Sequence, residues 1–149
     1  MCIRDSYSAL SIPDICGALE SNGGRASGKR YKKWFDEWVS HKYGGNLTGE
    51  QCYAFRCGIV HQGRAAHDNL GFTRVIFVEP EAGGIFHNNI INDALNIDVD
   101  TFCQDIVSSV KEWERAVSQT NNYKRNIPYL LQRYADGIYP YIVGVPVYA

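Results

Sequence analysis

An arginine and a histidine lie five residues apart in the segment 53–63, at Arg56 and His61. The segment is predicted to be helical, and on a helical wheel Arg56 falls inside an apolar stripe with Phe55 and Ile59. A guanidinium keeps its proton, so burying one requires a carboxylate, carbonyl oxygens at a helix end, or an anionic ligand. His61 in the last turn would meet the negative end of the helix dipole, which favours its charged form. One predicted helix therefore carries an anion binder and an acid.

The spacing of these two residues limits how they can act together. A step of five residues in a helix is one full turn plus about 140°, so Arg56 and His61 do not share a face of the helix. A joint site needs side chains that reach towards each other across the helix end, or a second copy of the helix. The alternative interpretation is structural: Arg56 is a buried ion-pair partner, and His61 is bonded to carbonyls at the helix end. An acidic side chain near Arg56 would favour this alternative.

The pattern Arg56-x-x-x-x-His61 at the end of a helix resembles the R-x(4–6)-H signature of the HEPN superfamily. Many members of that superfamily are metal-independent ribonucleases of toxin–antitoxin and antiviral defence systems. The resemblance covers chiefly residues 48–63. It implies a HEPN-like helical domain that works as a homodimer on RNA, with no cofactor and no metal. By the same resemblance, His61 would shuttle a proton between the 2′-hydroxyl and the leaving oxygen, and Arg56 would hold the scissile phosphate.

Two other functions fit the same resemblance. One is a HEPN-like interaction module without catalysis, for instance a partner of an antitoxin or of a defence-system protein. The other is an accessory subunit that binds nucleic acid without cutting it. Binding with the salt dependence of phosphate contacts, unaffected by His61→Ala, would indicate the accessory subunit.

Charge is unevenly distributed along the chain, although the net charge is only −1. Residues 25–74 hold 9 basic and 4 acidic residues, whereas residues 75–121 hold 2 and 8. One interpretation is a basic face that contacts the backbone of a nucleic acid. The other is that the cations form the solvated side of a helix and pair with the acidic half. The candidate nucleic-acid-binding residues are Lys29, Arg30, Lys33 and Arg64.

Other motifs are excluded by their context. Gly23-x-x-x-x-Gly28-Lys29 imitates a phosphate-binding loop, but Arg30 follows in place of the Ser or Thr that would hold Mg²⁺. His61 and His67 have the wrong spacing for a metal site on one helix face. A cysteine nucleophile next to His61 would need an orienting feature that the sequence lacks. The sequence therefore predicts no metal site.

Two helices are expected near the start of the chain. Ser11 and Pro13 are typical of a helix N-terminus, which predicts a short helix that ends at Leu19. Apolar residues then recur with the helical period over 31–39, which predicts a second helix that ends near Gly44.

A third helix and a small sheet are expected next. Thr48 and Gln51 have the spacing of a capping box, which would open a helix over 52–62. The segment 72–97 is rich in β-branched and aromatic residues, which predicts a small antiparallel meander. The fold class is therefore α+β, mainly α, with the meander inserted into a helical domain.

Two further helices and an extended tail complete the prediction. Asp98 or Asp100 would cap a long helix of about five turns, judged from its apolar period. Asn126 would cap a last helix, closed by Gly137, and the segment 139–148 suits an edge strand or an extended arm.

The composition indicates one globular domain over residues 7–149, because 45% of the chain is hydrophobic and 13% aromatic. Residues 1–6 resemble translated sequencing-adapter sequence, so they are expected to be a non-native leader. The chain is then expected to be truncated at one or both ends. Five cysteines without a C-x-x-C pair suggest reduced thiols. A cytoplasmic location is expected because the sequence shows neither a signal-peptide pattern nor a membrane-spanning segment. No apolar run is long enough to span a membrane.

Overall fold

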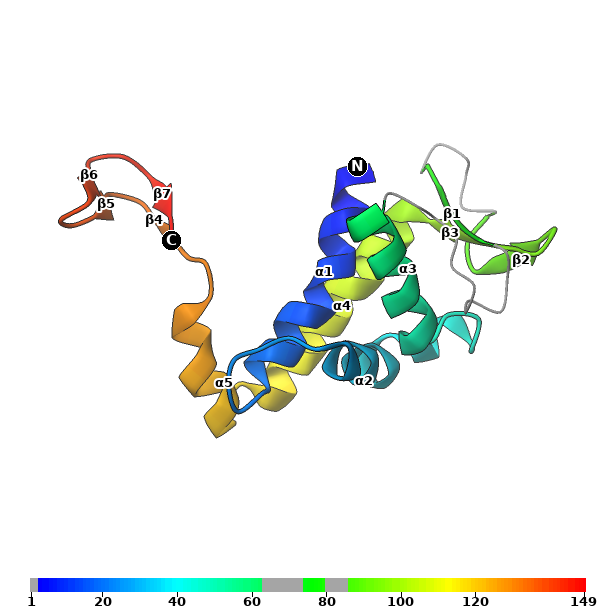
Figure 1. Cartoon of the computed structure of the whole chain (residues 1–149), viewed down its shortest axis with the longest axis horizontal. Helices are drawn as coiled ribbons and strands as arrows, with labels where there is room; N and C mark the ends of the chain where they lie inside the picture. Colours follow the sequence, from blue (N-terminus) through cyan, green and yellow to red (C-terminus); the bar gives the residue numbers. More distant parts are fainter. Residues whose placement is uncertain (1–2, 63–73, 80–85) are drawn as a thin grey trace.

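The computed structural model of the chain describes residues 3–62, 74–79 and 86–149, and at residues 3–5 and 60–62 it describes the backbone alone. The described residues form a mixed α+β structure in which helices dominate, as predicted. Its α-helices are α1 (Ile3–Leu19), α2 (Gly28–Trp38), α3 (Gly49–Gln62), α4 (Val99–Val117) and α5 (Asn121–Asn126). Figure 1 shows the long helices α1 and α4 side by side, with α2 and α3 packed beside them. A small sheet lies at one end of this bundle and a C-terminal arm at the other.

Helix α1 is longer than predicted. It runs through Pro13, which lies inside the helix and not in its first turn. A proline there removes a helical hydrogen bond, but Ala9 and Leu10 upstream are buried in the core, and their burial offsets that loss. The predicted cap Ser11 instead donates from its hydroxyl to the carbonyl of Tyr7, one turn earlier, at 3.1 Å. Residues 3–6, expected to precede the native fold, form the first turn of this helix.

Helix α2 forms where its apolar period predicts. Tyr31, Trp34 and Phe35 on one face are buried, and Trp34 meets Trp113 of α4 edge to face with ring centroids 6.3 Å apart. After α2 the chain continues as the short 3₁₀ helix η1 (Ser40–Tyr43) and turns at Gly44, whose φ is +57°. Helix α2 therefore forms the centre of the core, in contact with α1, α3 and α4.

The sheet lies in the predicted region, but its strands do not form the antiparallel meander that was predicted. Its strands β1 (Arg74–Val78), β2 (Asn89–Ile91) and β3 (Ala94–Asp98) have the order β1-β3-β2. β1 pairs parallel to β3, and only β2 pairs antiparallel to it. Asn92 and Asp93 separate β2 from β3; both adopt positive φ and make a two-residue turn. This turn places β3 in the centre, where all five of its residues are buried.

The helix after the sheet confirms one of the two predicted caps. Asp98 is the N-cap of α4, and its carboxylate accepts a hydrogen bond from the Thr101 amide at 2.7 Å. Because the last residue of β3 is also this cap, sheet and helix are joined without a loop. None of the described helices combines the length and the apolar character that crossing a bilayer requires.

The prediction of a last helix capped by Asn126 is wrong. Thr120 caps α5, which ends at Asn126 and is followed by the 3₁₀ turn η3 (Ile127–Tyr129). The buried side-chain amide of Asn126 donates to the carbonyls of Leu19 at 2.9 Å and of Ser21 at 2.7 Å, at the end of α1. Asn126 therefore satisfies acceptors of a distant helix end, a role that its local sequence does not reveal.

Residues 130–149 form an extended arm, which contains the segment 139–148 predicted as an edge strand or arm and also residues before Gly137 that were predicted to be helical. Two short antiparallel pairs build it, β4 (Arg133–Tyr134) with β7 (Val147–Tyr148) and β5 (Gly137–Ile138) with β6 (Ile142–Val143). None of these residues is buried. Figure 1 shows the arm extending from α5 away from the helices.

Candidate functional site

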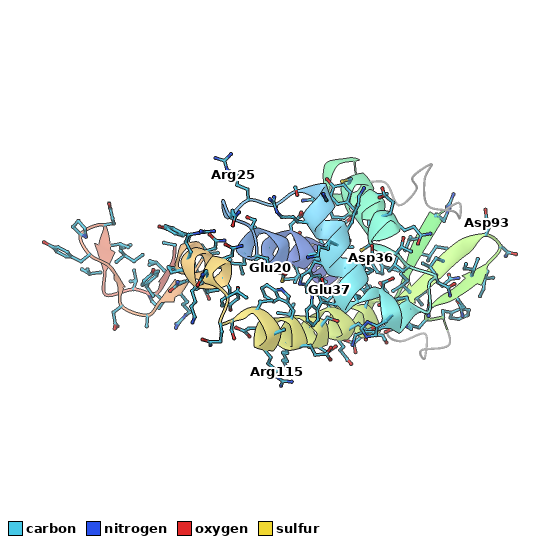
Figure 2. The ribbon with its side chains drawn as sticks, turned by 90° about the horizontal axis from the view of Figure 1, so that it is seen from below. Glu20, Arg25, Asp36, Glu37, Asp93 and Arg115 are labelled. Atoms are coloured by element: carbon cyan, nitrogen blue, oxygen red, sulfur yellow. The ribbon has the colours of Figure 1, made fainter. Side chains whose placement is uncertain are left out.

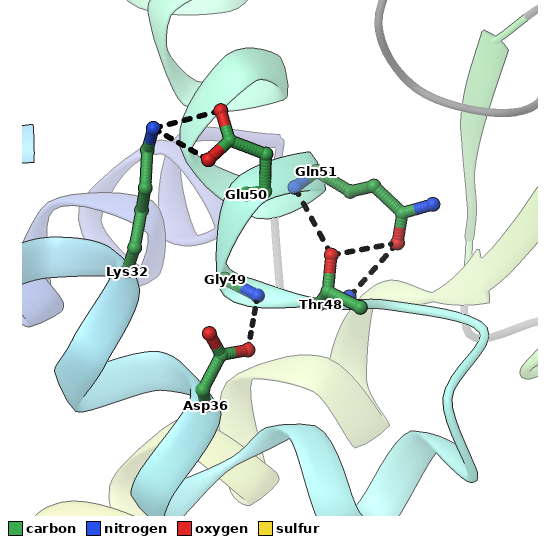
Figure 3. Close-up of polar contacts among 6 residues, drawn as sticks. All are labelled: Lys32, Asp36, Thr48, Gly49, Glu50 and Gln51. Carbon is green, nitrogen blue, oxygen red and sulfur yellow. Dashed lines mark hydrogen bonds and ion pairs between the residues drawn. The ribbon is translucent and has the colours of Figure 1, made fainter. Parts of the chain in front are cut away.

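Helix α3 begins with the predicted capping box (Figure 3). The Gln51 amide donates to the Thr48 hydroxyl at 3.3 Å, and the Thr48 amide donates to the Gln51 side-chain oxygen at 2.9 Å. The helix then continues without interruption to Gln62. The backbone that carries Arg56 and His61 is therefore the helix that the sequence predicts.

The start of α3 is attached to α2 by three further contacts (Figure 3). The Gly49 amide donates to the Asp36 carboxylate at 2.6 Å, and Lys32 forms an ion pair with Glu50 at 2.6 Å. Gly49 also lies against the backbone of Lys32, so closely that an added Cβ would overlap it. These contacts fix the position of α3, and hence of Arg56, relative to α2.

Arg56 points towards α1, where its guanidinium forms an ion pair with the carboxylate of Asp14 at 2.8 Å. The two side chains are 20% and 16% exposed, so the pair is largely but not fully shielded from water. Burial by itself would lower the pKa of Arg56, but the negative charge of Asp14 together with Cys57 and Tyr31 outweighs this, and the pKa is raised. The ion pair is the contact that the structural interpretation of Arg56 expects.

His61 lies in the last turn of α3, as predicted. Its side chain is outside the described part of the structure, as are all of Arg64 and His67. The helix geometry places His61 about 140° around the axis from Arg56. The described backbone thus keeps the two residues on one helix but on different faces of it.

Three of the four basic residues predicted to bind nucleic acid, Lys29, Arg30 and Lys33, lie on the first half of α2. Lys29 is exposed, and the guanidinium of Arg30 donates to the Arg25 carbonyl at 3.1 Å. Lys33 lies 4.0 Å from the carboxylate of Glu37. Arg30, Lys33 and Glu37 line one cavity of about 220 Å³ together with Glu20. The cavity is therefore lined by charges of both signs, and it does not include Arg56.

Charged side chains of α4 and of the loop after α1 project in several directions. Figure 2 shows Arg25 projecting from the loop after α1, and Arg115 of α4 projecting from the opposite side of the molecule. Glu20 accepts a hydrogen bond from the indole of Trp113 at 2.6 Å, so one of the carboxylates at the cavity also links α1 to α4.

A buried polar cluster next to Arg56 was not predicted from the sequence. The hydroxyl of Tyr31 lies 3.3 Å from the Cys52 sulfur and donates to the Leu10 carbonyl at 3.0 Å. Burial raises the pKa of Tyr31 well above its usual value and raises the pKa of Cys52 to about 12. Both groups therefore stay protonated and neutral at physiological pH.

Asp14 is the residue of this region that the sequence analysis missed. It directly follows Pro13, which together with Ser11 predicts a helix start. It lies four positions after Leu10 and three before Gly17, which are both buried. An acidic residue within the apolar stripe of a helix requires a cationic partner, just as an arginine does. Searching for a carboxylate and a guanidinium in two apolar stripes would have found the pair.

Neither a protein-family model, nor a curated protein, nor a solved structure matches this chain. The candidate site is therefore judged on its own geometry. Within the described residues, no group of three or more histidine, cysteine or acidic side chains lies close enough to hold a metal ion. The chemistry that these residues offer is anion binding by an arginine in a fixed orientation, together with a histidine at the end of the same helix.

Proposed function

We propose that this chain is an endoribonuclease of HEPN type that needs no metal ion and acts in the cytoplasm. The observation that carries the proposal is the placement of Arg56 and His61 on one continuous helix, with Arg56 oriented by Asp14 and still one-fifth exposed. An oriented guanidinium that solvent can reach is suited to a phosphate. The HEPN resemblance of residues 48–63 supports RNA as the substrate.

The cleavage step follows from these two groups. The imidazole of His61 removes the proton of a ribose 2′-hydroxyl, and the 2′-oxygen attacks the adjacent phosphorus. The new O2′–P bond forms as the P–O5′ bond breaks, and a histidine proton passes to the leaving 5′-oxygen. Arg56 stabilises the negative charge that develops on the phosphoryl oxygens. The products are a 2′,3′-cyclic phosphate and a 5′-hydroxyl.

A homodimer is part of the proposal, because one helix does not bring Arg56 and His61 onto a common face. A second copy of α3 facing the first would place the arginine of one chain near the histidine of the other. Lys29, Arg30, Lys33 and Arg64 are proposed to guide the RNA backbone by long-range attraction, which falls as ionic strength rises.

The Arg56–Asp14 ion pair also supports a second candidate function. A carboxylate at 2.8 Å satisfies the charge of Arg56 without any ligand. Under this alternative the chain is a HEPN-like interaction module, bound to an antitoxin or another defence protein, and α3 serves only the fold. The two candidates differ in whether the chain itself cuts RNA.

The test is a cleavage assay on the purified full chain, with a fluorescent mixed-sequence RNA and excess chelator. Wild type is compared with His61→Ala and with the matched control His41→Ala, because His41 is an exposed histidine of η1. We expect wild type and His41→Ala to cleave equally, and His61→Ala to be slower by about 100-fold or more. The products are examined for the cyclic phosphate end.

Equal cleavage by wild type and His61→Ala, including no cleavage by either, would overturn the proposed nuclease. RNA binding measured in the same samples then separates the alternatives. Binding that weakens with salt and survives His61→Ala would indicate an accessory nucleic-acid binder, and no binding would favour the interaction module.

A further inference from the structure

The arm formed by residues 130–149 carries most of the exposed large apolar side chains of the described chain. Tyr141 is 87% exposed and Leu131 is 69% exposed. Further apolar side chains in both strand pairs are exposed as well. The large exposed residues of the arm and its root are Tyr129, Leu130, Leu131, Tyr134, Tyr139, Tyr141, Ile142, Val143, Val145 and Tyr148. An apolar surface of this extent marks a binding surface.

The arm is held together by its own backbone hydrogen bonds. β4 pairs with β7 and β5 with β6, and Gln132 and Ala149 exchange two further bonds at 2.8 and 3.1 Å. Two-residue strands without a packed face are only marginally stable in water. The arm therefore needs a surface to pack on, and Figure 1 shows that its strands extend away from the helices of their own chain.

A groove suited to such an arm lies at its root. Ile15 and Leu19 of α1 line it on one side, and Tyr129 and Leu130 on the other, around a volume of about 610 Å³. Arg25 and Arg125 also line it, and Figure 2 shows Arg25 projecting outward there. An apolar floor with guanidinium groups beside it suits tyrosine rings, which bury their carbon surface and stack on cations.

We infer that this groove receives the arm of a second copy of the same chain, so that two chains exchange arms around a twofold axis. Arm and groove are adjacent on each chain, so one rotation satisfies both contacts and closes the assembly. The arm holds one cation, Arg133, and one anion, Asp136, so two copies meet without net repulsion. Its twenty residues, added to those that line the groove, match the roughly 20–30 residues that each side of a stable interface contributes.

This inference does not rest on the proposed nuclease activity. Figures 1 and 2 both show the arm at the opposite end of the molecule from the sheet, with α3 on the far side of α1 from the arm. The arm-exchanged dimer thus uses a different surface from the α3 dimer proposed above. Its readout is molecular mass and not RNA cleavage, so either proposal can fail alone.

The experiment measures the mass of the full chain by sedimentation equilibrium over a range of concentrations up to about 100 μM. Wild type is compared with an arm variant, Tyr141→Ser with Val143→Ser, and with a groove variant, Ile15→Glu. Val107→Glu is the matched control, because Val107 is an exposed apolar residue of α4 away from both arm and groove. All substitutions are at exposed positions, and circular dichroism checks that each variant is folded.

We expect the arm and groove variants each to lose the arm-mediated association at least tenfold more readily than wild type and Val107→Glu. Their mass should then be half that of wild type: a monomer against a dimer or, where the α3 contact also forms, a dimer against a tetramer. Mixing the two defective variants should restore part of the association, because one of the two contacts then joins an intact arm to an intact groove. A monomeric wild type would overturn the inference. So would an Ile15→Glu chain with the same mass as wild type at every concentration, or a mixture of the two variants that associates no further than either variant alone.

Discussion

The guanidinium of Arg56 lies 2.8 Å from the carboxylate of Asp14, a contact between α3 and α1 across forty-two positions of sequence. The pair is largely shielded, and its partners come from the two helices that the candidate site depends on. This one contact both holds α3 against α1 and sets the direction of the arginine that is proposed to bind phosphate. Under the proposed function, stability and activity are therefore coupled at this point of the fold.

Asp14→Asn should lower the free energy of unfolding by about 1–3 kcal/mol, because Arg56 keeps its charge and loses its partner in a shielded setting. Urea denaturation at pH 7 measures the loss. Glu37→Gln is the control, since Lys33 and Glu37 form an exposed pair at 4.0 Å, and its effect should stay below about 0.5 kcal/mol. If the two losses are equal, the Asp14 contact contributes no more than a surface ion pair.

Gly49→Ala should destabilise the fold by about 1–3 kcal/mol, since the added Cβ would overlap the backbone of Lys32 and force α3 away from α2. Gly23→Ala is the matched control, because a Cβ at Gly23 meets open space. Its effect should be within about 1 kcal/mol of zero. Thermal unfolding of both variants measures the difference. If Gly49→Ala has the same unfolding temperature as wild type, the two helices can move apart at little cost.

Asp98→Ala should cost about 1 kcal/mol at pH 7, through loss of the α4 cap. Hydrogen bonds from Thr101, with His87 nearby, hold the pKa of Asp98 below its usual value. The charged cap therefore stabilises the fold at pH values above the unfolded pKa of about 3.9, and this contribution is lost as the pH falls through the lower folded pKa.

Denaturation of wild type and Asp98→Ala at several pH values checks this dependence, and their difference should shrink below about pH 4. Asp98→Asn is the control, because asparagine also caps helices but does not titrate. Its difference from Asp98→Ala should stay constant with pH. A wild-type advantage that persists under strong acid would show that the carboxylate charge is not what stabilises the cap.

Cys57 should react with a thiol reagent well before Cys16 and Cys52 do. Burial raises the pKa of Cys16 and of Cys52 to about 12, and both side chains are inaccessible, whereas Cys57 is only half-buried. Labelling at pH 8 followed by peptide mass spectrometry identifies the modified thiols. Labelling after unfolding in urea is the control, in which all of them should react. Early modification of Cys52 in the native chain would contradict the core packing of α3.

Hydrogen bonds between neighbours in the chain were predictable from sequence. The capping box of Thr48 and Gln51 and the cap of Asp98 both follow from side chains that reach backbone amides three residues away. The apolar period of α2 and α4 likewise identified the faces that are buried. In the candidate site, this reasoning placed Arg56 and His61 on one helix.

The predictions that failed depended on partners far along the chain. Asn126 resembles a helix cap, but its amide serves the end of α1, more than a hundred residues earlier. Pro13 resembles a helix start, yet burial of the preceding turns carries the helix through it. The β1-β3-β2 order depends on which strand packs between two others, a choice that a single strand's residue pattern does not contain.

The sequence by itself determined where α2, α3 and α4 form and which residues face inward, because residue spacing along a helix sets its faces and its end contacts. Tertiary structure alone decided that Asp14 pairs with Arg56 and that the Asn126 amide bonds to the carbonyls at the end of α1. It also decided that residues 130–149 form an exposed apolar arm. The physical reason is that local hydrogen bonds depend on separations of three or four residues. Contacts between distant segments depend on which faces of the helices and the sheet pack together in the folded chain.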